Sequence, residues 1–308
     1  MSKMVRIAKV IATIFLPRGV REFTSITGDP LTFSAHSQKF ITTNEIIDLL
    51  KLNIKLEKEY SLEKYIKRDL IIVSPSVKNK EGEKFLSEIN NLVIPGGKVL
   101  ILERENIGMS YGSYSDAFKK YKNYYDYFLF TEDDWLIYGE KYFDVGLNVF
   151  KKDKTVGMVA YQAKTRIGKH HWEDLDLNQN NAFTCHSTCG LASTEALNKI
   201  FNKFGRLPYF DGNDYFKSIR YGECKFGSSF YKDGYKIEDL PRDKVLGMPA
   251  YDYIRKIPYK KYPNYFDKIY IYYIKSVLKR HIAKFIWKLV SATKPTKNLY
   301  LKIISKIK

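Results

Sequence analysis

Residues 127–135 read YFLFTEDDW, an apolar run that leads directly into three acids. The first five residues are of types that favour extended structure, so a strand is predicted from Tyr127 to Thr131. In an open α/β sheet, ligands bind outside the carboxyl ends of the strands, and Glu132, Asp133 and Asp134 directly follow such an end. The stretch therefore predicts an α/β sheet with a carboxylate cluster at its ligand-binding edge.

Three adjacent carboxylates repel one another unless a cation or hydrogen-bond donors compensate them. A divalent ion that takes one or two carboxylates and completes its shell with phosphate oxygens suits such a cluster. A solvated acidic turn at the end of a strand is the alternative interpretation. The sequence on either side has to decide between the two.

Apolar runs alternate with amphipathic segments along the chain, which is the pattern of a mostly parallel sheet covered by helices. Further strands are predicted over residues 8–16, 70–74, 99–102 and 156–161. Helices are predicted after Asn44, around Phe85, Ile89 and Leu92, over 114–121, and from Ser193. Residues 164–184 are expected to form a long loop and residues 210–234 a glycine-rich region. The expected fold class is α/β, Rossmann-like, with a basic helical tail.

The basic charge of the chain is concentrated at its C-terminal end. The net charge is +18, and residues 260–308 hold thirteen Lys and Arg against the single acid Asp267. A length of 308 residues fits one large domain with an appendage, here residues 1–258 and 259–308. Apolar residues recur at three- and four-residue spacing from Ile271 to Leu289, which predicts a basic amphipathic helix.

This tail has three interpretations. Its lysines and aromatic residues suit an anionic membrane surface, its apolar face can equally pack on the catalytic domain, and its charge alone permits nucleic-acid binding. No recognised nucleic-acid motif accompanies it, so no specific nucleic-acid partner is expected. The expected location is the cytoplasm, with peripheral attachment to the inner face of the membrane.

The cysteines and the N-terminal sequence agree with that location. Cys185, Cys189 and Cys224 have no paired CxxC spacing, so neither a zinc site nor a disulfide framework is expected. Residues 5–16 are apolar, but Arg6 and Lys9 interrupt them and no cleavage site follows. We interpret this segment as a buried strand, with a signal anchor as the alternative.

A second motif lies at the end of the strand predicted over residues 99–102. Residues 103–112 read ERENIGMSYG, in which Arg104, Asn106 and Gly108 form an R-x-N-x-G pattern. Together with the E-D-D triplet, a variant of the D-x-D motif, this arrangement over residues 5–240 resembles the GT-A fold of nucleotide-sugar glycosyltransferases of the family 2 type. The resemblance implies that Asp134 binds a divalent metal, Mn²⁺ or Mg²⁺, which bridges the donor diphosphate. It also implies that Glu132 contacts the ribose or the metal and its water shell.

The same resemblance assigns neighbouring residues to the nucleotide-diphospho-sugar donor. Asn106, Gly108 and Asp133 are expected beside the nucleotide, although turn chemistry alone also explains Gly108. Many members have an Asp after the second strand to hold the base, whereas Ser74 and Ser76 occupy this place here. The E-D-D form resembles that of certain N-acetylglucosaminyltransferases.

Inverting members of the family use a carboxylate base at the start of a helix that ends in a G-Y-x-I-like segment. Glu223 occupies the matching place, ahead of the sequence GYKI at residues 234–237. Asp214 and Asp211 are rival candidates, and capping of a helix N-terminus is the alternative role for Glu223. An inverting reaction depends on the Glu223 assignment, because the base must reach the attacking hydroxyl.

The sequence thus favours a metal-dependent glycosyltransferase of the hexosyl or N-acetylhexosaminyl class, acting on a glycan or lipid-linked acceptor in polysaccharide biosynthesis. A sugar-phosphate nucleotidyltransferase is a second hypothesis, but no glycine-rich, lysine-bearing phosphate loop follows the first strand at residues 15–19. A non-enzymatic basic protein that binds a membrane or nucleic acid is the third.

Overall fold

The computed structural model describes residues 4–15, 43–75, 79–139, 141–185, 189–212, 215–241 and 246–249. All of these residues belong to one structural unit. The predicted amphipathic tail and the predicted boundary after residue 258 lie outside the described residues. The division into two domains therefore stays a prediction.

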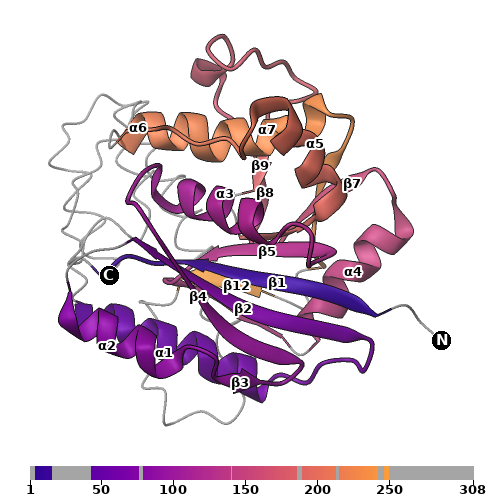
Figure 1. Cartoon of the computed structure of the whole chain (residues 1–308). Coiled ribbons are helices and arrows are strands. Elements are labelled where there is room, and N and C mark those ends of the chain that lie inside the picture. The colour runs from indigo at the N-terminus through magenta and orange to yellow at the C-terminus, as the bar shows by residue number, and fades with distance from the viewer. Residues whose placement is uncertain are drawn as a thin grey trace, which may run out of the picture. The chain divides into compact units, whose positions relative to one another are not determined.

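The described unit is built on an eight-stranded, mostly parallel sheet (Figure 1). The strand order is β11-β7-β10-β5-β1-β2-β4-β3. Strands β1, β2, β4 and β5 run parallel to one another, as do β7 and β11, whereas β10 is antiparallel to both of its neighbours and β3 to β4. The strands are β1 Val5–Ala12, β2 Ile66–Pro75, β3 Val93–Ile94, β4 Gly97–Arg104, β5 Tyr127–Glu132, β7 Val156–Ala160, β10 Gly190–Ser193 and β11 Lys236–Asp239.

Two small ribbons accompany this sheet, and both are antiparallel. Strand β6, Trp135–Tyr138, pairs with β12, Leu246–Pro249, and β8, Lys164–Arg166, pairs with β9, Phe183–Cys185. The five strands predicted from the sequence are confirmed as β1, β2, β4, β5 and β7. The segment 164–184, expected to be a loop, contains β8, a 3₁₀ turn at Lys169–His171 and most of β9.

Helices cover both faces of the large sheet. Side chains on successive residues of β1 and β5 alternate between the faces: Ala8 and Phe128 pack in one apolar cluster, Ile7 and Leu129 in the other. The first cluster takes in α3, α5 and α7, and the second takes in α4. The helices are α1 Thr43–Glu59, α2 Lys80–Ile89, α3 Met109–Tyr121, α4 Tyr142–Lys152, α5 Thr194–Phe204, α6 Tyr215–Ser218 and α7 Lys225–Lys232.

Some predicted helix boundaries shift in the structure. Helix α1 begins at Thr43, so Asn44 lies within its first turn and does not cap it, and α2 ends before Leu92. Ser193 does cap α5, because its side chain accepts a hydrogen bond from the Ala196 N–H.

The glycine-rich region after residue 210 is mainly helical. Helix α6, a six-residue π-helical turn at Ile219–Cys224, and α7 follow one another without a break. Gly222 lies against the ring of Tyr111, and Gly227 lies against Thr184, so a side chain at either position would collide with its neighbour. These glycines allow close packing and are not turn residues.

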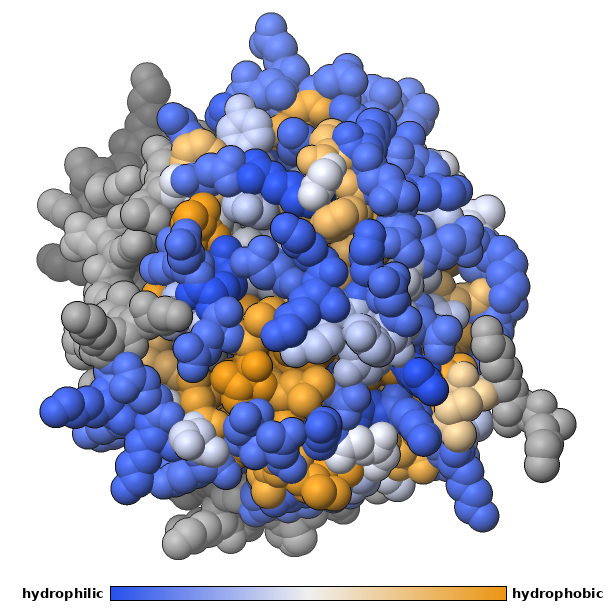
Figure 2. Space-filling model, in the orientation of Figure 1, coloured by the Kyte–Doolittle hydropathy of each residue, from blue (hydrophilic) through white to orange (hydrophobic). Residues whose placement is uncertain are grey.

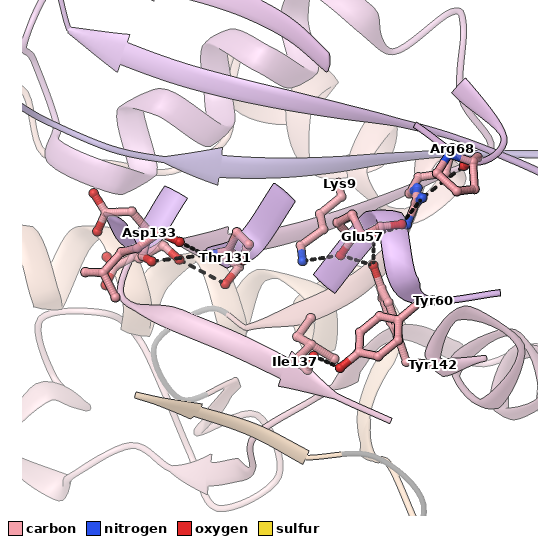
Figure 3. A network of polar contacts seen from close by, with 12 residues as sticks. Lys9, Glu57, Tyr60, Arg68, Thr131, Asp133, Ile137 and Tyr142 are labelled. Carbon is pink, nitrogen blue, oxygen red and sulfur yellow. Dashed lines mark hydrogen bonds and ion pairs between the residues drawn. The ribbon is translucent and has the colours of Figure 1, made fainter. Parts of the chain in front are cut away.

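A buried ionic cluster explains how a charged residue fits inside β1 (Figure 3). The Lys9 ammonium lies 2.6 Å from the Glu57 carboxylate on α1, which also contacts the Arg68 guanidinium on β2. The Tyr142 hydroxyl on α4 donates to the same carboxylate at 2.8 Å. All four residues are at most 2% exposed. Burial, followed by the nearby Arg68 charge, lowers the pKa of Lys9 to about 7.

The interpretation of the N-terminal run as a buried strand is therefore confirmed. Residues 7–12 of β1 are all buried, and Lys9 is accommodated by its partners and not by solvent. Within the part of the chain that the structure describes, no helix has the length and apolar character needed to cross a bilayer.

Candidate functional site

The three consecutive acids lie at the carboxyl edge of the parallel strands, as the sequence predicts. Strand β5 ends at Glu132, which is paired in register with Ala12 at the end of β1. Asp133 and Asp134 form the tight turn between β5 and β6. This is the edge at which ligands bind in open α/β sheets.

Asp133 faces the interior (Figure 3). It is fully buried, and its carboxylate accepts a 2.5 Å hydrogen bond from the Thr13 hydroxyl. Its backbone N–H donates to the Ala12 carbonyl at 3.1 Å, and its carbonyl accepts from the Asn53 side chain at 3.2 Å. Asp133 therefore joins the end of β1, helix α1 and the β5–β6 turn.

Glu132 faces helix α3 on the other side of the strand. Its half-buried carboxylate accepts a hydrogen bond from the Ser110 hydroxyl in the first turn of α3. The Tyr114 ring lies one helical turn further on and is 1% exposed. Burial raises the pKa of Tyr114 well above its usual value, and the nearby carboxylates of Glu132, Asp134 and Asp133 raise it further. Tyr114 thus keeps its proton, and its hydroxyl has no hydrogen-bond partner among the described residues.

The loop that leads into α3 carries the predicted nucleotide-binding residues. Gly108 precedes the helix with φ +76°, a conformation that favours glycine, and the Tyr209 ring packs against it. Arg104 holds the loop in place, because its guanidinium contacts Asp116 at 2.6 Å and the Ile107 carbonyl at 2.5 Å. Asn106 is exposed at the tip of this loop. The loop therefore presents Asn106 to solvent, whereas Gly108 is buried beneath the Tyr209 ring.

Glu223 lies within the π-helical turn, near the first turn of α3. Its neighbour Gly222 packs on Tyr111, the residue after Ser110. The Glu223 carbonyl accepts a 2.8 Å hydrogen bond from the Thr184 hydroxyl. The helical segment from α6 to α7 is continuous, so Glu223 does not cap a helix N-terminus, and that alternative is wrong. Single π-helical turns are frequent at functional sites.

Two buried thiols connect the surroundings of Glu132 and Glu223. The Cys185 Sγ lies 3.1 Å from the Cys189 carbonyl. Burial raises the pKa of Cys189 to about 12, with Glu132 among the smaller contributions. Burial likewise raises the pKa of Cys185, followed by the charges of Cys189 and Glu223. Both thiols therefore keep their protons at neutral pH.

The remaining predicted site residues are placed as follows. Asp211 is exposed and paired with Arg206 through two contacts of 2.5 and 2.7 Å, which lower its pKa and make it a weaker base. Ser74 is 2% exposed, and its hydroxyl donates to the Pro75 carbonyl. Asp214 and Ser76 lie outside the described residues.

The acids fit a divalent ion that is shared with a phosphate ligand. Among the described residues, no three His, Cys, Asp or Glu side chains are grouped so that they hold a metal by themselves. Glu132 and Asp134 are hard oxygen donors of the type that Mg²⁺ or Mn²⁺ takes from a protein when a diphosphate completes its shell. Asp134 is only 7% exposed, so a metal bound there would be largely shielded from solvent.

Sequence reasoning missed Ser110, Tyr114, Thr13 and Asn53, which surround the acids in the structure. Ser110 could have been noticed as a hydroxyl two residues after Gly108, in the first turn of the next helix. Tyr114 follows it one turn later on the same face. Thr13 and Asn53 are distant from the acids in sequence and carry no local signal.

The buried thiols give the unfolding free energy a defined dependence on pH. A thiol whose pKa is raised on folding is protonated in both states below about pH 8.5, the pKa of the thiol in the unfolded chain. Above that pH the unfolded chain loses the proton first, so the free energy of unfolding falls as the pH rises. We expect Cys185→Ala to be less sensitive to alkaline pH than the wild type, by up to about 1.4 kcal/mol per pH unit above pH 8.5. Urea unfolding of both proteins over this range measures the difference. Lys9 adds the same pH dependence to both proteins, so its effect cancels in the comparison. Parallel curves would contradict the prediction.

No family model and no curated protein matches the sequence. Solved structures match at low identity. The mannosyltransferase PcManGT of Pyrobaculum calidifontis, solved with GDP-Man and Mn²⁺, is 14% identical; the match covers 96% of this chain and 66% of that one, with a TM-score of 0.42. TarS of S. aureus is 10% identical, with 77% of this chain and 35% of TarS covered and a TM-score of 0.42. The 4-diphosphocytidyl-2C-methyl-D-erythritol synthase of Anaerococcus prevotii is 11% identical, with coverages of 77% and 86% and a TM-score of 0.38.

These structures carry different activities in their names. The function of this chain therefore has to be inferred from its own residues.

Proposed function

We propose that this chain is an inverting, metal-dependent glycosyltransferase. In this proposal it moves a hexosyl or N-acetylhexosaminyl group from a nucleotide-diphospho-sugar to a glycan or lipid-linked acceptor. One observation carries the proposal: Glu132 and Asp134 lie at the carboxyl edge of the sheet, beside the start of α3, and Glu223 lies near the same helical turn. A metal-binding pair of acids and a separate carboxylate base are what this reaction requires.

The donor diphosphate is assigned to the edge of the sheet at which the acids and the start of α3 lie. Glu132 and Asp134 would hold Mn²⁺ or Mg²⁺, which neutralises charge on the departing diphosphate when bound. Ser110 donates to Glu132 and so fixes the direction of its carboxylate. Gly108 allows the left-handed turn that begins α3, and the N-terminus of this 13-residue helix favours an anion. Asn106 and Ser76 remain assigned to the nucleotide side, whereas Asp133 and Ser74 are buried and bonded within the protein.

Glu223 is the proposed general base. As the acceptor oxygen forms its bond to the anomeric carbon, the bond from that carbon to the diphosphate oxygen breaks, and the acceptor hydroxyl proton passes to Glu223. Attack on the face opposite the leaving group inverts the anomeric configuration. Asp211 is the weaker candidate, because its ion pair with Arg206 lowers its pKa.

We expect Glu223→Gln to lower kcat for sugar transfer by about 10²–10⁴-fold while donor binding is retained. Glutamine keeps the size of the side chain but cannot accept the proton. Glu195→Gln, at an exposed position in the first turn of α5, is the matched control. Transfer by Glu223→Gln at the rate of this control would assign the base to another residue.

The test of the whole proposal is donor binding and hydrolysis by the purified chain. A panel of nucleotide-sugars is titrated with and without Mn²⁺, and released nucleotide and sugar are measured. Metal-dependent binding of one donor supports the proposal and identifies the nucleotide. No binding of any donor would favour a non-enzymatic protein. The membrane partner and the cytoplasmic location remain predictions that rest on the basic tail.

A further inference from the structure

A second concave surface lies at the opposite edge of the sheet from the acids. This groove, of about 1100 Å³, is lined by residues at or near the starts of β1, β2 and β4 and by residues around the C-terminal end of α3. Pockets for small ligands are typically about 300–1000 Å³, so the groove is at the upper limit for a small molecule. Its size fits a segment of a longer chain.

The groove is lined by cations without acidic partners. Its five basic side chains are all exposed, and none of them forms an ion pair with a described residue; they are Arg6, Lys64, Lys67, Lys98 and Lys120. Uncompensated cations around one concavity create a positive potential that selects an anionic ligand.

The two acids in the lining are already engaged. Glu63 contacts the Lys141 ammonium at 2.5 Å. Asp69 accepts hydrogen bonds from the Lys98 backbone N–H and from the Tyr125 hydroxyl, both at 2.8 Å. Glu63 is thus compensated by Lys141, whereas Asp69 keeps its charge because both of its donors are neutral. One acid therefore stands against the five cations, and the lining stays net positive.

Between the charges the groove has an apolar and aromatic lining. Leu100 and Pro95 contribute to it, and Val93 and Tyr124 are 77% and 61% exposed. Figure 2 shows an apolar area, bordered by hydrophilic residues, on the face where β2 and β4 lie in Figure 1. Apolar surface together with cations suits a ligand that has both sugar ring faces and acidic groups.

We propose that this groove binds an anionic glycan, a chain of sugars that bear carboxylate or phosphate groups. The choice of a glycan rests on the proposed transferase function, whereas the anionic character rests on the groove alone. The site would hold a part of the acceptor or product chain away from the reacting end.

Two other occupants fit less well. Binding of single-stranded nucleic acid uses several aromatic rings on which successive bases stack. Here Lys120 lies over the Tyr121 ring and Tyr125 packs on Phe128, so Tyr124 alone offers a largely exposed ring. A membrane surface is flat and cannot enter a groove.

The groove lies far from the acidic residues, which limits the part it can play in the reaction. Strand β1 has 8 residues between the two edges, which corresponds to roughly 25 Å. A glycan bound in the groove is thus remote from Glu132 and Asp134. Such a second contact would keep the acceptor near the site between turnovers and raise its effective concentration.

The test is calorimetric titration of the purified full chain with oligogalacturonate and with a phosphorylated mannan, without donor or metal. We expect both glycans to bind and salt to weaken the binding, and a neutral dextran oligomer to fail to bind. The double variant K67Q/K120Q removes one charge from the β2 side and one from the α3 side, and should weaken binding by about tenfold. The double variant K80Q/K84Q makes the same charge change on α2 and should bind as the wild type does.

Equal weakening by the two double variants, or no binding of either glycan, would overturn the proposal. Tighter binding of oligothymidylate or of anionic vesicles than of the glycans would assign the groove to those partners instead. Donor hydrolysis is measured on the same samples. If the transferase proposal fails, hydrolysis is absent while glycan binding persists; if the groove proposal fails, the reverse is observed.

Discussion

Asp134→Ala is expected to abolish metal-dependent donor binding and to lower kcat/KM by about 10²–10³-fold, the usual effect of removing one preorganised electrostatic group. The reason is its position: Asp134 is 7% exposed in the turn after β5, and Glu132 at the end of that strand is fixed by Ser110. Without Asp134, a shared ion would keep a single protein carboxylate. Titration of the donor with and without Mn²⁺ measures the loss directly.

The control for this variant is Glu81→Ala, which removes an exposed acid from the first turn of α2. It should retain both donor binding and turnover. Circular dichroism and thermal unfolding of Asp134→Ala establish that the protein is folded. Full activity in a folded Asp134→Ala protein would contradict the metal assignment and leave the acidic triplet as a structural turn.

Glu57→Gln is expected to destabilise the protein by about 3–5 kcal/mol, the usual result of breaking a buried ion pair from one side. Among the described residues, Glu57 is the acid that contacts both Lys9 and Arg68. The substitution leaves the buried Arg68 without its counter-charge and Lys9 without its carboxylate partner. Since domains have total stabilities of about 5–15 kcal/mol, much of the protein could be unfolded at 37 °C. Urea unfolding near 20 °C measures the change.

Glu59→Gln is a matched control on the same helix. Glu59 lies 3.5 Å from Lys55, and both side chains are close to half exposed. An exposed pair of this kind contributes at most about 1 kcal/mol, so the control should unfold almost as the wild type does. If both variants lose equally little free energy of unfolding, the buried cluster does not stabilise the fold.

The main strands could be predicted from the sequence because each is a compact run of β-favouring residues. Strand β10 was missed, since Gly190–Ser193 has four residues with three small side chains and no run of large apolar ones. The sequence does not show why the helical segment Tyr215–Lys232 contains glycines, because their contacts, Tyr111 and Thr184, are far away in the sequence. Lys9 can lie in a buried strand because it pairs with Glu57. That residue is 48 positions away, so the pairing could not be predicted from the local sequence.

The position of the acidic cluster followed from the sequence, but the separate environments of its members did not. Alternation along an extended chain directs Glu132 toward α3 and Asp133 toward Thr13, and only the fold shows what lies on each side. Glu223 was placed beside a helix start by resemblance, while the structure places it within a continuous helix. The contact between Tyr111 and Gly222 joins residues far apart in the sequence, so no local sequence pattern predicts it.

The π-helical turn at Ile219–Cys224 has a consequence for how this helix can change. A turn of α-helix holds 3.6 residues, so one residue more or less rotates everything beyond it by about 100°. Phe226 and Phe230 are buried in the core after this turn, while Glu223 sits within it. The extra residue thus fixes the angular offset between the residues before the turn and the two phenylalanines after it. Removing one residue from the turn would rotate α6 by about 100° relative to Phe226 and Phe230, and the segment could then no longer keep both sides in place.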